Sequence, residues 1–209
     1  MPIEKLLIAN RGEIAVRIAR AAGDLGIVSV ATFSSDDHLS LHTQVADASV
    51  GLEGSGAAAY LDIDQIVAVA ISNGCDAVHP GYGFLAENAD FARAMENEGI
   101  TFVGPHSDQL ALFGDKLSAR NLATQLDVPV VPATAGAANS EEIEEFLAEH
   151  GAIMVKAVAG GGGRGMREVR SGQDVPAIFE RCQSEAQSAF GIGDLYAEKL
   201  IETAVSYTH

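Results

Sequence analysis

The sequence predicts an α/β fold in two units, and three observations support this prediction. In the first hundred residues, short apolar runs alternate with longer amphipathic segments, a pattern typical of a mostly parallel, doubly wound sheet. Further on, a glycine-rich stretch at 160–165 separates two strand-like runs. With 209 residues, of which 47% are hydrophobic, the chain can form one large core or two small ones.

The first half contains the elements that a parallel sheet requires. Strands are expected at 5–9, 27–33, 76–79 and 100–104, with helices at 13–26, 63–74 and 88–99. Asp62 and Gln65 resemble a capping box that opens the second of these helices. Ligands of such sheets bind beyond the carboxyl ends of the strands, where "NRGE" (10–13) and "HPGYGFLAEN" (79–88) would lie.

The second half begins with a helical segment at 106–132, which we expect to be broken at Gly114-Asp115. The later pattern predicts helix 140–151, strand 152–158, strand 166–170, helix 175–190 and strand 195–201. We therefore expect a Rossmann-like domain at 1–112, a helical connection at 113–130, a small flap-bearing subdomain at 131–204 and a divergent tail at 205–209.

The net charge of −16 argues against binding to nucleic acid or to an anionic membrane, since both require a basic surface. The most basic window contains Lys156, Arg164, Arg167 and Arg170. Two distant cysteines without metal-ligand spacing favour a reducing compartment. Because neither a signal peptide nor a membrane-spanning segment is evident, we expect a soluble, cytoplasmic protein.

The glycine stretch formally matches G-x-G-x-x-G, but a strand follows it where a dinucleotide-binding turn would open a helix. It also lacks the Gly-Lys-Ser/Thr of a phosphate-binding P-loop. One hypothesis is a flexible surface hairpin. The other is a flap whose amides bind phosphate oxygens, with Lys156 on the same sheet face as Met154 and close to the ligand.

Other charged residues have alternative interpretations. Lys116 on its own would be an ordinary solvated helix lysine, and His79 before Pro80 a structural histidine. Glu198 and Lys199 are adjacent in a strand-like run, so their side chains should point to opposite faces.

Several segments in this order resemble the biotin carboxylases: "IANRGEIAVRIARA", "HPGYGFLAEN", "FVGP", "GDK" and "GGGGRGMR". These are the ATP-dependent components of acyl-CoA carboxylases, such as acetyl- and propionyl-CoA carboxylase, and of pyruvate carboxylase. The resemblance covers residues 3 to about 204. It implies a Rossmann-like N-terminal domain, called pre-ATP-grasp, followed by a partial ATP-grasp module with a glycine-rich hairpin flap.

The resemblance also implies a reaction and its components. ATP would phosphorylate bicarbonate, and the carboxyphosphate formed would release CO2 for capture by a ureido nitrogen of biotin. The implied cofactors are ATP and Mg2+, with biotin as the substrate on a carrier domain. The implied partners are that carrier, a carboxyltransferase and, in the full-length protein, a second copy in a homodimer.

Site residues follow from the resemblance where the motifs match. Lys116 and Lys156 resemble the two lysines that bind phosphates, and Gly162 and Gly163 the flap glycines above them. Glu198 and Lys199 resemble the pair that reads the adenine amino group. Leu200 and Ile201 then correspond to the segment beside the ring.

The end of the chain departs from the family. Val205 and Ser206 stand where the family has an Arg-His pair, and His209 does not replace that histidine. The family's metal-binding glutamates, its bicarbonate-binding arginines and its catalytic base lie further on. We therefore assign no catalytic or metal-binding residue, and expect a fragment that is inactive alone.

Two other functions stay open. Another ATP-grasp ligase would explain the flap but not "HPGYGFLAEN", and a non-catalytic nucleotide-binding module would bind ATP without turnover. An NAD-dependent oxidoreductase is disfavoured because "IANRGE" lacks the glycines of the pyrophosphate turn.

Overall fold

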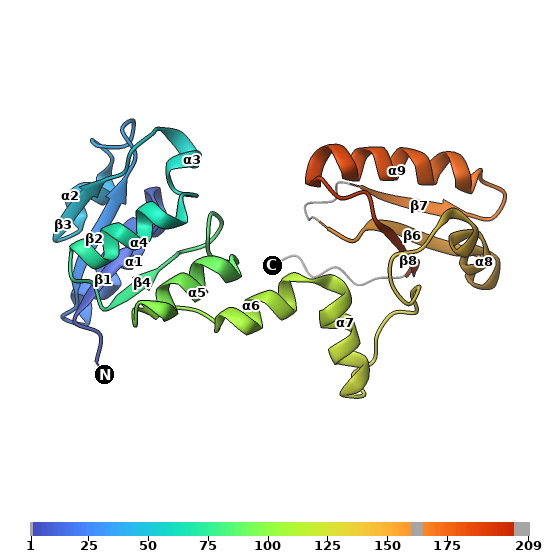
Figure 1. Ribbon diagram of the computed structural model, residues 1–209, viewed down its shortest axis with the longest axis horizontal. Coiled ribbons are helices and arrows are strands. Elements are labelled where there is room, and N and C mark those ends of the chain that lie inside the picture. The colour runs from blue at the N-terminus through green and yellow to red at the C-terminus, as the bar shows by residue number, and fades with distance from the viewer. Residues whose placement is uncertain (1, 160–164, 203–209) are drawn as a thin grey trace. The chain divides into compact units, whose positions relative to one another are not determined.

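The computed structural model describes residues 2–159 and 165–202. It forms two compact units, Met1–Gly114 and Asp115–His209, labelled by element in Figure 1. The helical connection expected at 113–130 therefore belongs, from Asp115 on, to the second unit. As predicted, the helix breaks at Gly114-Asp115, between α6 (Ser107–Gly114) and α7 (Lys116–Gln125).

The first unit contains the predicted parallel sheet, with the strand order β3-β2-β1-β4-β5. Its strands are β1 (Lys5–Ile8), β2 (Val28–Phe33), β3 (Ala48–Gly51), β4 (Ala77–His79) and β5 (Thr101–Phe102). Its other helices are α1 (Gly12–Asp24), α2 (Leu41–Val45), α3 (Gly56–Ala59), α4 (Ile63–Ser72) and α5 (Ala89–Asn97). The expected doubly wound α/β class is confirmed.

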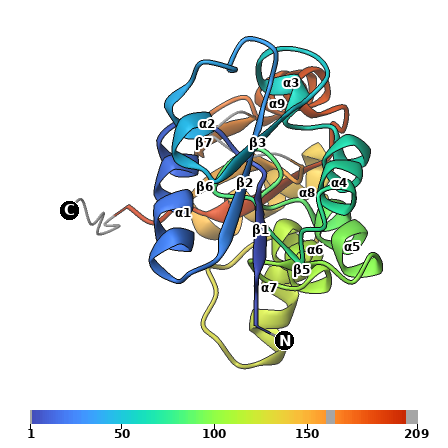
Figure 2. The same ribbon diagram turned by 90° about the vertical axis from the view of Figure 1, so that its left-hand side faces the viewer.

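Alternation along β1 explains the layers of this unit. Leu6 and Ile8 pack with α1 on one face, whereas Leu7 packs with α4 and α5 on the other. Figure 2 shows α1 on one side of the sheet and α4 and α5 on the opposite side. Because β1 lies between β2 and β4, the strand order changes direction at the β1–β4 pair, where such sheets bind ligands.

The capping box expected at the start of α4 is only half present. The Asp62 side chain accepts a hydrogen bond from the Gln65 backbone N–H at 3.0 Å, as predicted. The Gln65 side chain instead bonds to the backbone of Glu53, because the chain before α3 passes within its reach. A complete capping box, formed by Asn139 and Glu142, opens α8 (Ser140–His150).

The second unit has an antiparallel sheet with the order β7-β6-β8. The strands are β6 (Ala152–Ala157), β7 (Met166–Arg170) and β8 (Leu195–Lys199). Besides α7 and α8 the unit contains α9 (Val175–Phe190), which runs alongside the strands in Figure 1. The connection between β6 and β7 joins two antiparallel neighbours, so the predicted hairpin is confirmed.

The two faces of this second sheet differ in chemistry. Ile153, Val155 and Ala157 of β6 are buried in a core with residues of α8 and α9. The alternating positions and their cross-strand partners lie on the other face, which we call the charged face: Met154, Lys156, Tyr196 and Glu198.

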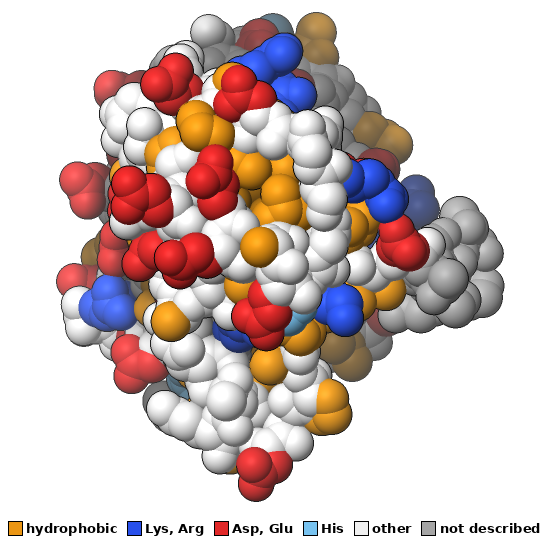
Figure 3. Space-filling model, turned by 90° about the vertical axis from the view of Figure 1, so that its right-hand side faces the viewer, with side chains coloured by type: hydrophobic (Ala, Val, Ile, Leu, Met, Phe, Trp, Pro, Cys, Tyr) orange, Lys and Arg blue, Asp and Glu red, His pale blue; other side chains and the backbone are white. Residues whose placement is uncertain are grey.

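The molecular surface reflects the acidic composition. Figure 3 shows acidic side chains spread across one face, whereas basic side chains there lie apart from one another. Within residues 2–159 and 165–202, no helix is both long and apolar enough to cross a bilayer.

Candidate functional site

The charged face is organised around an ion pair between two strands. Lys156 of β6 and Glu198 of β8 meet with 2.5 Å between Nζ and Oε2, and their side chains are 23% and 19% exposed. In the sheet register Lys156 lies opposite Tyr196, and Glu198 lies opposite Met154, so the pair spans a diagonal between strands. The half-buried lysine of this otherwise apolar strand therefore has a charged partner, Glu198.

The surroundings of Glu198 keep its carboxylate ionised. Burial alone would raise the pKa of Glu198, but hydrogen bonding and charge attraction from Lys156 outweigh it and hold the pKa below its usual value. The Tyr196 hydroxyl donates to Oε1 at 3.0 Å and acts in the same direction. The face therefore carries a fixed positive and a fixed negative charge side by side.

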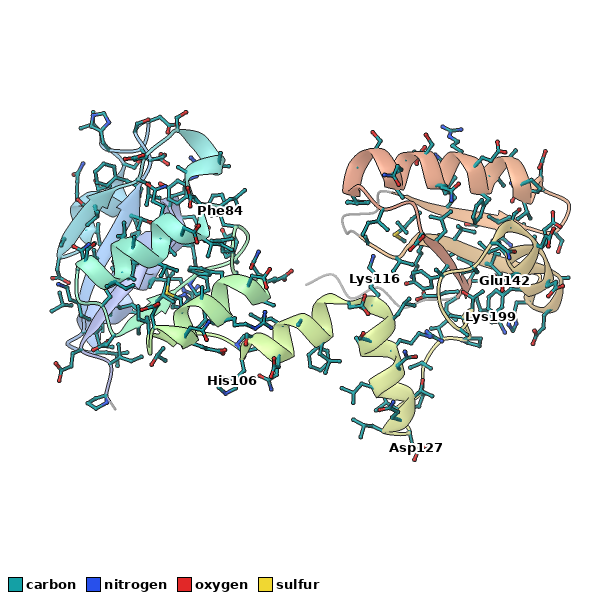
Figure 4. The ribbon with its side chains drawn as sticks, in the orientation of Figure 1. Phe84, His106, Lys116, Asp127, Glu142 and Lys199 are labelled. Carbon is teal, nitrogen blue, oxygen red and sulfur yellow. The ribbon has the colours of Figure 1, made fainter. Side chains whose placement is uncertain are left out.

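Lys116 reaches the same strand from α7. The Asp115 side chain caps this helix by accepting a hydrogen bond from the Ser118 N–H at 2.7 Å, which fixes where the helix begins. From the first helical position Lys116 extends its Nζ to 3.4 Å from the Ala157 carbonyl oxygen, at the end of β6. Figure 4 shows Lys116 at the start of α7. The structure thus brings Lys116 to the strand that carries Lys156.

The glycine hairpin follows this point. Gly162 and Gly163 lie outside the described residues. At its end, the Gly165 carbonyl accepts a hydrogen bond from the Ala157 N–H at 3.0 Å. Gly165 has φ +67°, and a Cβ there would lie 3.1 Å from that of Ala157 in β6, so the position just before β7 requires glycine.

The end of β8 separates the predicted adenine-contacting residues. Lys199 lies opposite Ile153 in the register, so its side chain is on the opposite side of the sheet from Glu198, as the alternation predicted. Its N–H donates to the Pro132 carbonyl at 2.8 Å, and the Leu200 N–H to the Ala152 carbonyl at 3.0 Å. Ile201 is 48% exposed. Glu198 therefore joins Lys156 on the charged face, whereas Lys199 does not.

Two residues of this site, Tyr196 and Arg120, were not predicted from the sequence. Tyr196 could have been found, because it lies two positions before Glu198 in the same strand and must share its face. Arg120 of α7 donates to the Val131 carbonyl, and its charge helps to lower the pKa of Glu198 and partly opposes the rise in the pKa of Tyr196. No sequence pattern could have placed Arg120, since its position depends on tertiary packing.

The first unit holds its two N-terminal motifs together, as predicted, at the carboxyl ends of β1 and β4. Asn10 is 3% exposed, and its Nδ2 donates to the carbonyls of Pro80 and Tyr82 at 2.7 and 2.9 Å. The loop that it holds contains positive φ angles at Gly81, Gly83 and Phe84. Such a backbone path persists only where surrounding contacts determine it.

Arg11 forms the second contact between these motifs. Its guanidinium pairs with Asp37 at 2.9 Å and lies 5.7 and 5.9 Å from the ring centroids of Tyr60 and Phe84. The two rings stack at 5.1 Å. His79 accepts a hydrogen bond from the Gly81 N–H at 3.0 Å, and burial lowers its pKa, which fits the structural role expected for it. These contacts of Arg11 and His79 stabilise the loop that follows β4.

Two family models match the chain. "Biotin carboxylase, N-terminal domain" matches residues 2–110, and "Carbamoyl-phosphate synthase L chain, ATP binding domain" matches residues 115–206. The fold and the second unit therefore define an α/β protein with an ATP-binding domain of the ATP-grasp class. The chain belongs to the biotin carboxylase family.

Similar proteins agree with this assignment. Pyruvate carboxylase of Bacillus subtilis is 50% identical over 205 residues, and that of Aspergillus niger is 48% identical over 208 residues. The matches cover 96% and 97% of the chain but only 18% and 17% of these relatives. The biotin carboxylase–β-γ-ATP complex from Campylobacter jejuni matches with a TM-score of 0.91 and 39% identity, covering 96% of this chain and 46% of that one.

Proposed function

We propose that this chain supplies the nucleotide-binding part of a biotin carboxylase, which carboxylates biotin at the expense of ATP. The observation that supports the proposal is the ion pair between Lys156 and Glu198, together with Lys116 of α7. The Lys116 Nζ lies at the end of β6, where the glycine hairpin begins. Phosphoryl transfer relies on positioned cations and amides rather than on covalent chemistry by the protein, and the two lysines are the cations that support the proposal.

The residue roles follow from chemistry and from the family. Lys116 and Lys156 would bind phosphate oxygens, and the amides of Gly162 and Gly163 would close over them. Glu198 is the group that can accept a hydrogen bond from the adenine amino group. Lys199, Leu200 and Ile201 would contact the ring through their backbone and through the exposed apolar side chain of Ile201.

The proposed reaction has three steps. Bicarbonate oxygen attacks the γ-phosphorus of ATP, which gives carboxyphosphate and ADP. Carboxyphosphate breaks its C–O bond to phosphate and releases CO2 and inorganic phosphate. The released phosphate takes the proton of a ureido N–H of biotin, and this nitrogen forms a bond to the CO2 carbon. A similar structure, the biotin carboxylase domain dimer of 2-oxoglutarate carboxylase from Hydrogenobacter thermophilus, is a complex with ADP and bicarbonate (TM-score 0.90, 42% identity, covering 97% of this chain and 45% of that one).

Magnesium requires ligands that the described part of the chain does not offer. Within residues 2–159 and 165–202 no group of three His, Cys, Asp or Glu side chains could hold a metal ion. Mg2+ bound elsewhere in the longer protein would neutralise phosphate charge. We assign no step of the reaction to it through residues of this chain.

For the final acceptor of the carboxyl group and for the partners, we propose only what members of the family have in common. The sequence resemblance includes acetyl- and propionyl-CoA carboxylases, whereas the curated relatives named above are pyruvate carboxylases. We therefore propose the step common to both, the carboxylation of biotin on a carrier domain, with a carboxyltransferase as the second partner. A homodimer of the longer protein is proposed because the similar domain from Hydrogenobacter thermophilus is a dimer.

Titration calorimetry with ATP tests the proposal on the chain itself. The wild-type chain should bind ATP, and Lys156→Ala should weaken binding by at least about tenfold, because a charge-assisted phosphate contact is lost. Lys5→Ala is a matched control, since Lys5 lies on a strand of the first unit. Equal affinities of wild type and Lys156→Ala would contradict the proposal.

Another ATP-grasp ligase is the second candidate, because the model that matches residues 115–206 is named after carbamoyl-phosphate synthase. The match of residues 2–110 to the biotin carboxylase N-terminal domain favours the first proposal. Biotin-stimulated ATP hydrolysis by a protein that contains this chain within a complete biotin carboxylase domain would separate the two.

A further inference from the structure

Tyr196 is the most deeply buried side chain of the charged face. It is 3% exposed, and its hydroxyl lies 3.0 Å from Glu198 Oε1. Tyr196 and Glu198 are two positions apart in β8 and therefore share a face. In the register Tyr196 lies opposite Lys156, so all three side chains belong to one network.

The two oxygens of Glu198 have different donors. Lys156 binds Oε2 from β6, and Tyr196 binds Oε1 from within β8. A single ammonium partner would leave the carboxylate free to turn around that contact, whereas two donors on paired strands fix its plane. A carboxylate has about four lone-pair directions, so acceptor capacity remains for a ligand. The side chain is 19% exposed, so a ligand can reach it.

The charge states of the network suit this arrangement. Burial, followed by the neighbouring carboxylate, raises the pKa of Tyr196, so its hydroxyl stays protonated and can only donate to Glu198. Glu198 stays ionised, because Lys156 and Tyr196 outweigh its burial and lower its pKa. The direction of the hydrogen bond is therefore fixed over the neutral pH range.

We propose that Tyr196 is a positioning residue that fixes the Glu198 carboxylate in the orientation that selects a 6-amino purine over a 6-oxo purine. This inference rests on the proposed function. An ionised carboxylate can only accept hydrogen bonds, so it accepts from the 6-amino group of adenine and opposes the 6-oxygen of hypoxanthine. Sites built around such a hydrogen bond reject the mismatched analogue strongly.

Without the Tyr196 hydroxyl the carboxylate can rotate about its contact with Lys156. It can then turn away from a 6-oxygen, and it also spends less time facing a 6-amino group. The expected effect is a loss of discrimination between two triphosphates, since the lysines that bind the phosphates are unchanged.

The experiment measures the dissociation constants of ATP and ITP for the chain by titration calorimetry. The wild type should prefer ATP, and Tyr196→Phe should reduce the ratio of the two constants by about tenfold, as expected when the orientation of a charged hydrogen-bond acceptor is lost. Tyr60→Phe is the matched control. Tyr60 is fully buried in the first unit, and its hydroxyl donates to a carboxylate, Asp37, at 3.1 Å. It should reduce stability and leave the ATP/ITP ratio unchanged.

A second variant keeps the inference testable if Tyr196→Phe does not fold. Glu198→Asp retains the charge and the tyrosine but withdraws the carboxylate by one methylene from its donors, and should also reduce the ratio. An unchanged ratio in folded Tyr196→Phe would overturn the positioning role while leaving the proposed function intact. An unchanged ratio in folded Glu198→Asp would overturn both the positioning role and the adenine contact proposed for Glu198, while leaving ATP binding through the two lysines intact. Failure of the wild-type chain to bind ATP would instead overturn the proposed function, and the inference with it.

Discussion

At the scale of single residues, the charged face shows how two paired strands can carry a lysine and a glutamate without loss of the fold. Each charge lies on the side of the sheet away from α8 and α9, and each has a partner at hydrogen-bond distance. The pair should therefore stabilise the chain as well as offer a site for ligand.

Glu198→Gln tests that contribution through pH. The folded pKa of Glu198 is depressed, so its contribution is present above the unfolded pKa and is lost as the pH falls through the folded value. We expect the variant to be less stable by about 2 kcal/mol near neutral pH, the value of a hydrogen bond to a charged group. The difference should shrink below about pH 4, where the carboxyl becomes protonated in the unfolded chain and then in the folded chain.

Urea unfolding near neutral pH and near pH 3 provides the measurement. Glu144→Gln on the exposed side of α8 is the control, and it should change stability little at either pH. A difference for Glu198→Gln that is the same at both pH values would show that its ionisation does not stabilise the fold.

At the scale of elements, the loop after β4 depends on one buried amide. Asn10 satisfies two carbonyl oxygens of the 79–84 segment and is almost completely buried. Asn10→Ala should cost about 2–3 kcal/mol, because it leaves these acceptors without a donor. Asn73→Ala removes two contacts of a partly exposed amide at the end of α4, to Val69 O at 2.8 Å and to Ser72 Oγ at 3.3 Å, and should cost about 1 kcal/mol or less. Comparable losses for the two variants in urea unfolding would contradict this role of Asn10.

The same loop provides a comparison between two glycines with equal backbone strain. Gly81 and Gly83 have φ +67° and +66°, so alanine is disfavoured at both by about 1–2 kcal/mol. A Cβ at Gly81 would also lie 2.6 Å from Asn10 Nδ2, whereas nothing lies within 4 Å of one at Gly83. Gly81→Ala should therefore lower the thermal midpoint further than Gly83→Ala. Equal shifts of the two thermal midpoints would mean that the Asn10 side chain can move away from a Cβ at Gly81 without loss of stability.

Elements with a strong apolar pattern could be predicted from the sequence, and weakly patterned ones could not. The strand at Ala152–Ala157 alternates buried and partly exposed residues. This alternation, with a second strand-like run at Met166–Arg170, was enough to predict the hairpin. The edge strand Ala48–Gly51 was missed, because it contains no fully buried residue that would mark it. In the site, Lys116, Lys156 and Glu198 came from motifs. Tyr196 was missed although its spacing from Glu198 would have placed it on the same face, whereas Arg120 acts through helix packing, which the sequence alone does not specify.

At the scale of the whole molecule, each of the two units has its own hydrophobic core. Ile66 belongs to the core of the first unit and Ile153 to that of the second, and both are fully buried. A separate core is what a domain needs to fold cooperatively by itself. We therefore expect local stability to be set within each unit.

Reciprocal core substitutions test this expectation. Ile153→Ala should cost about 2–5 kcal/mol in the second unit, because it leaves a cavity between the sheet and its helices. Hydrogen exchange followed by mass spectrometry should then accelerate in β6, β7 and β8 while β1 and β4 keep their protection. Ile66→Ala should produce the opposite pattern, with faster exchange confined to the parallel sheet. If either substitution accelerated exchange equally in both sheets, the chain would unfold as a single cooperative body, and the residues proposed to bind ATP could not be varied independently of the first unit.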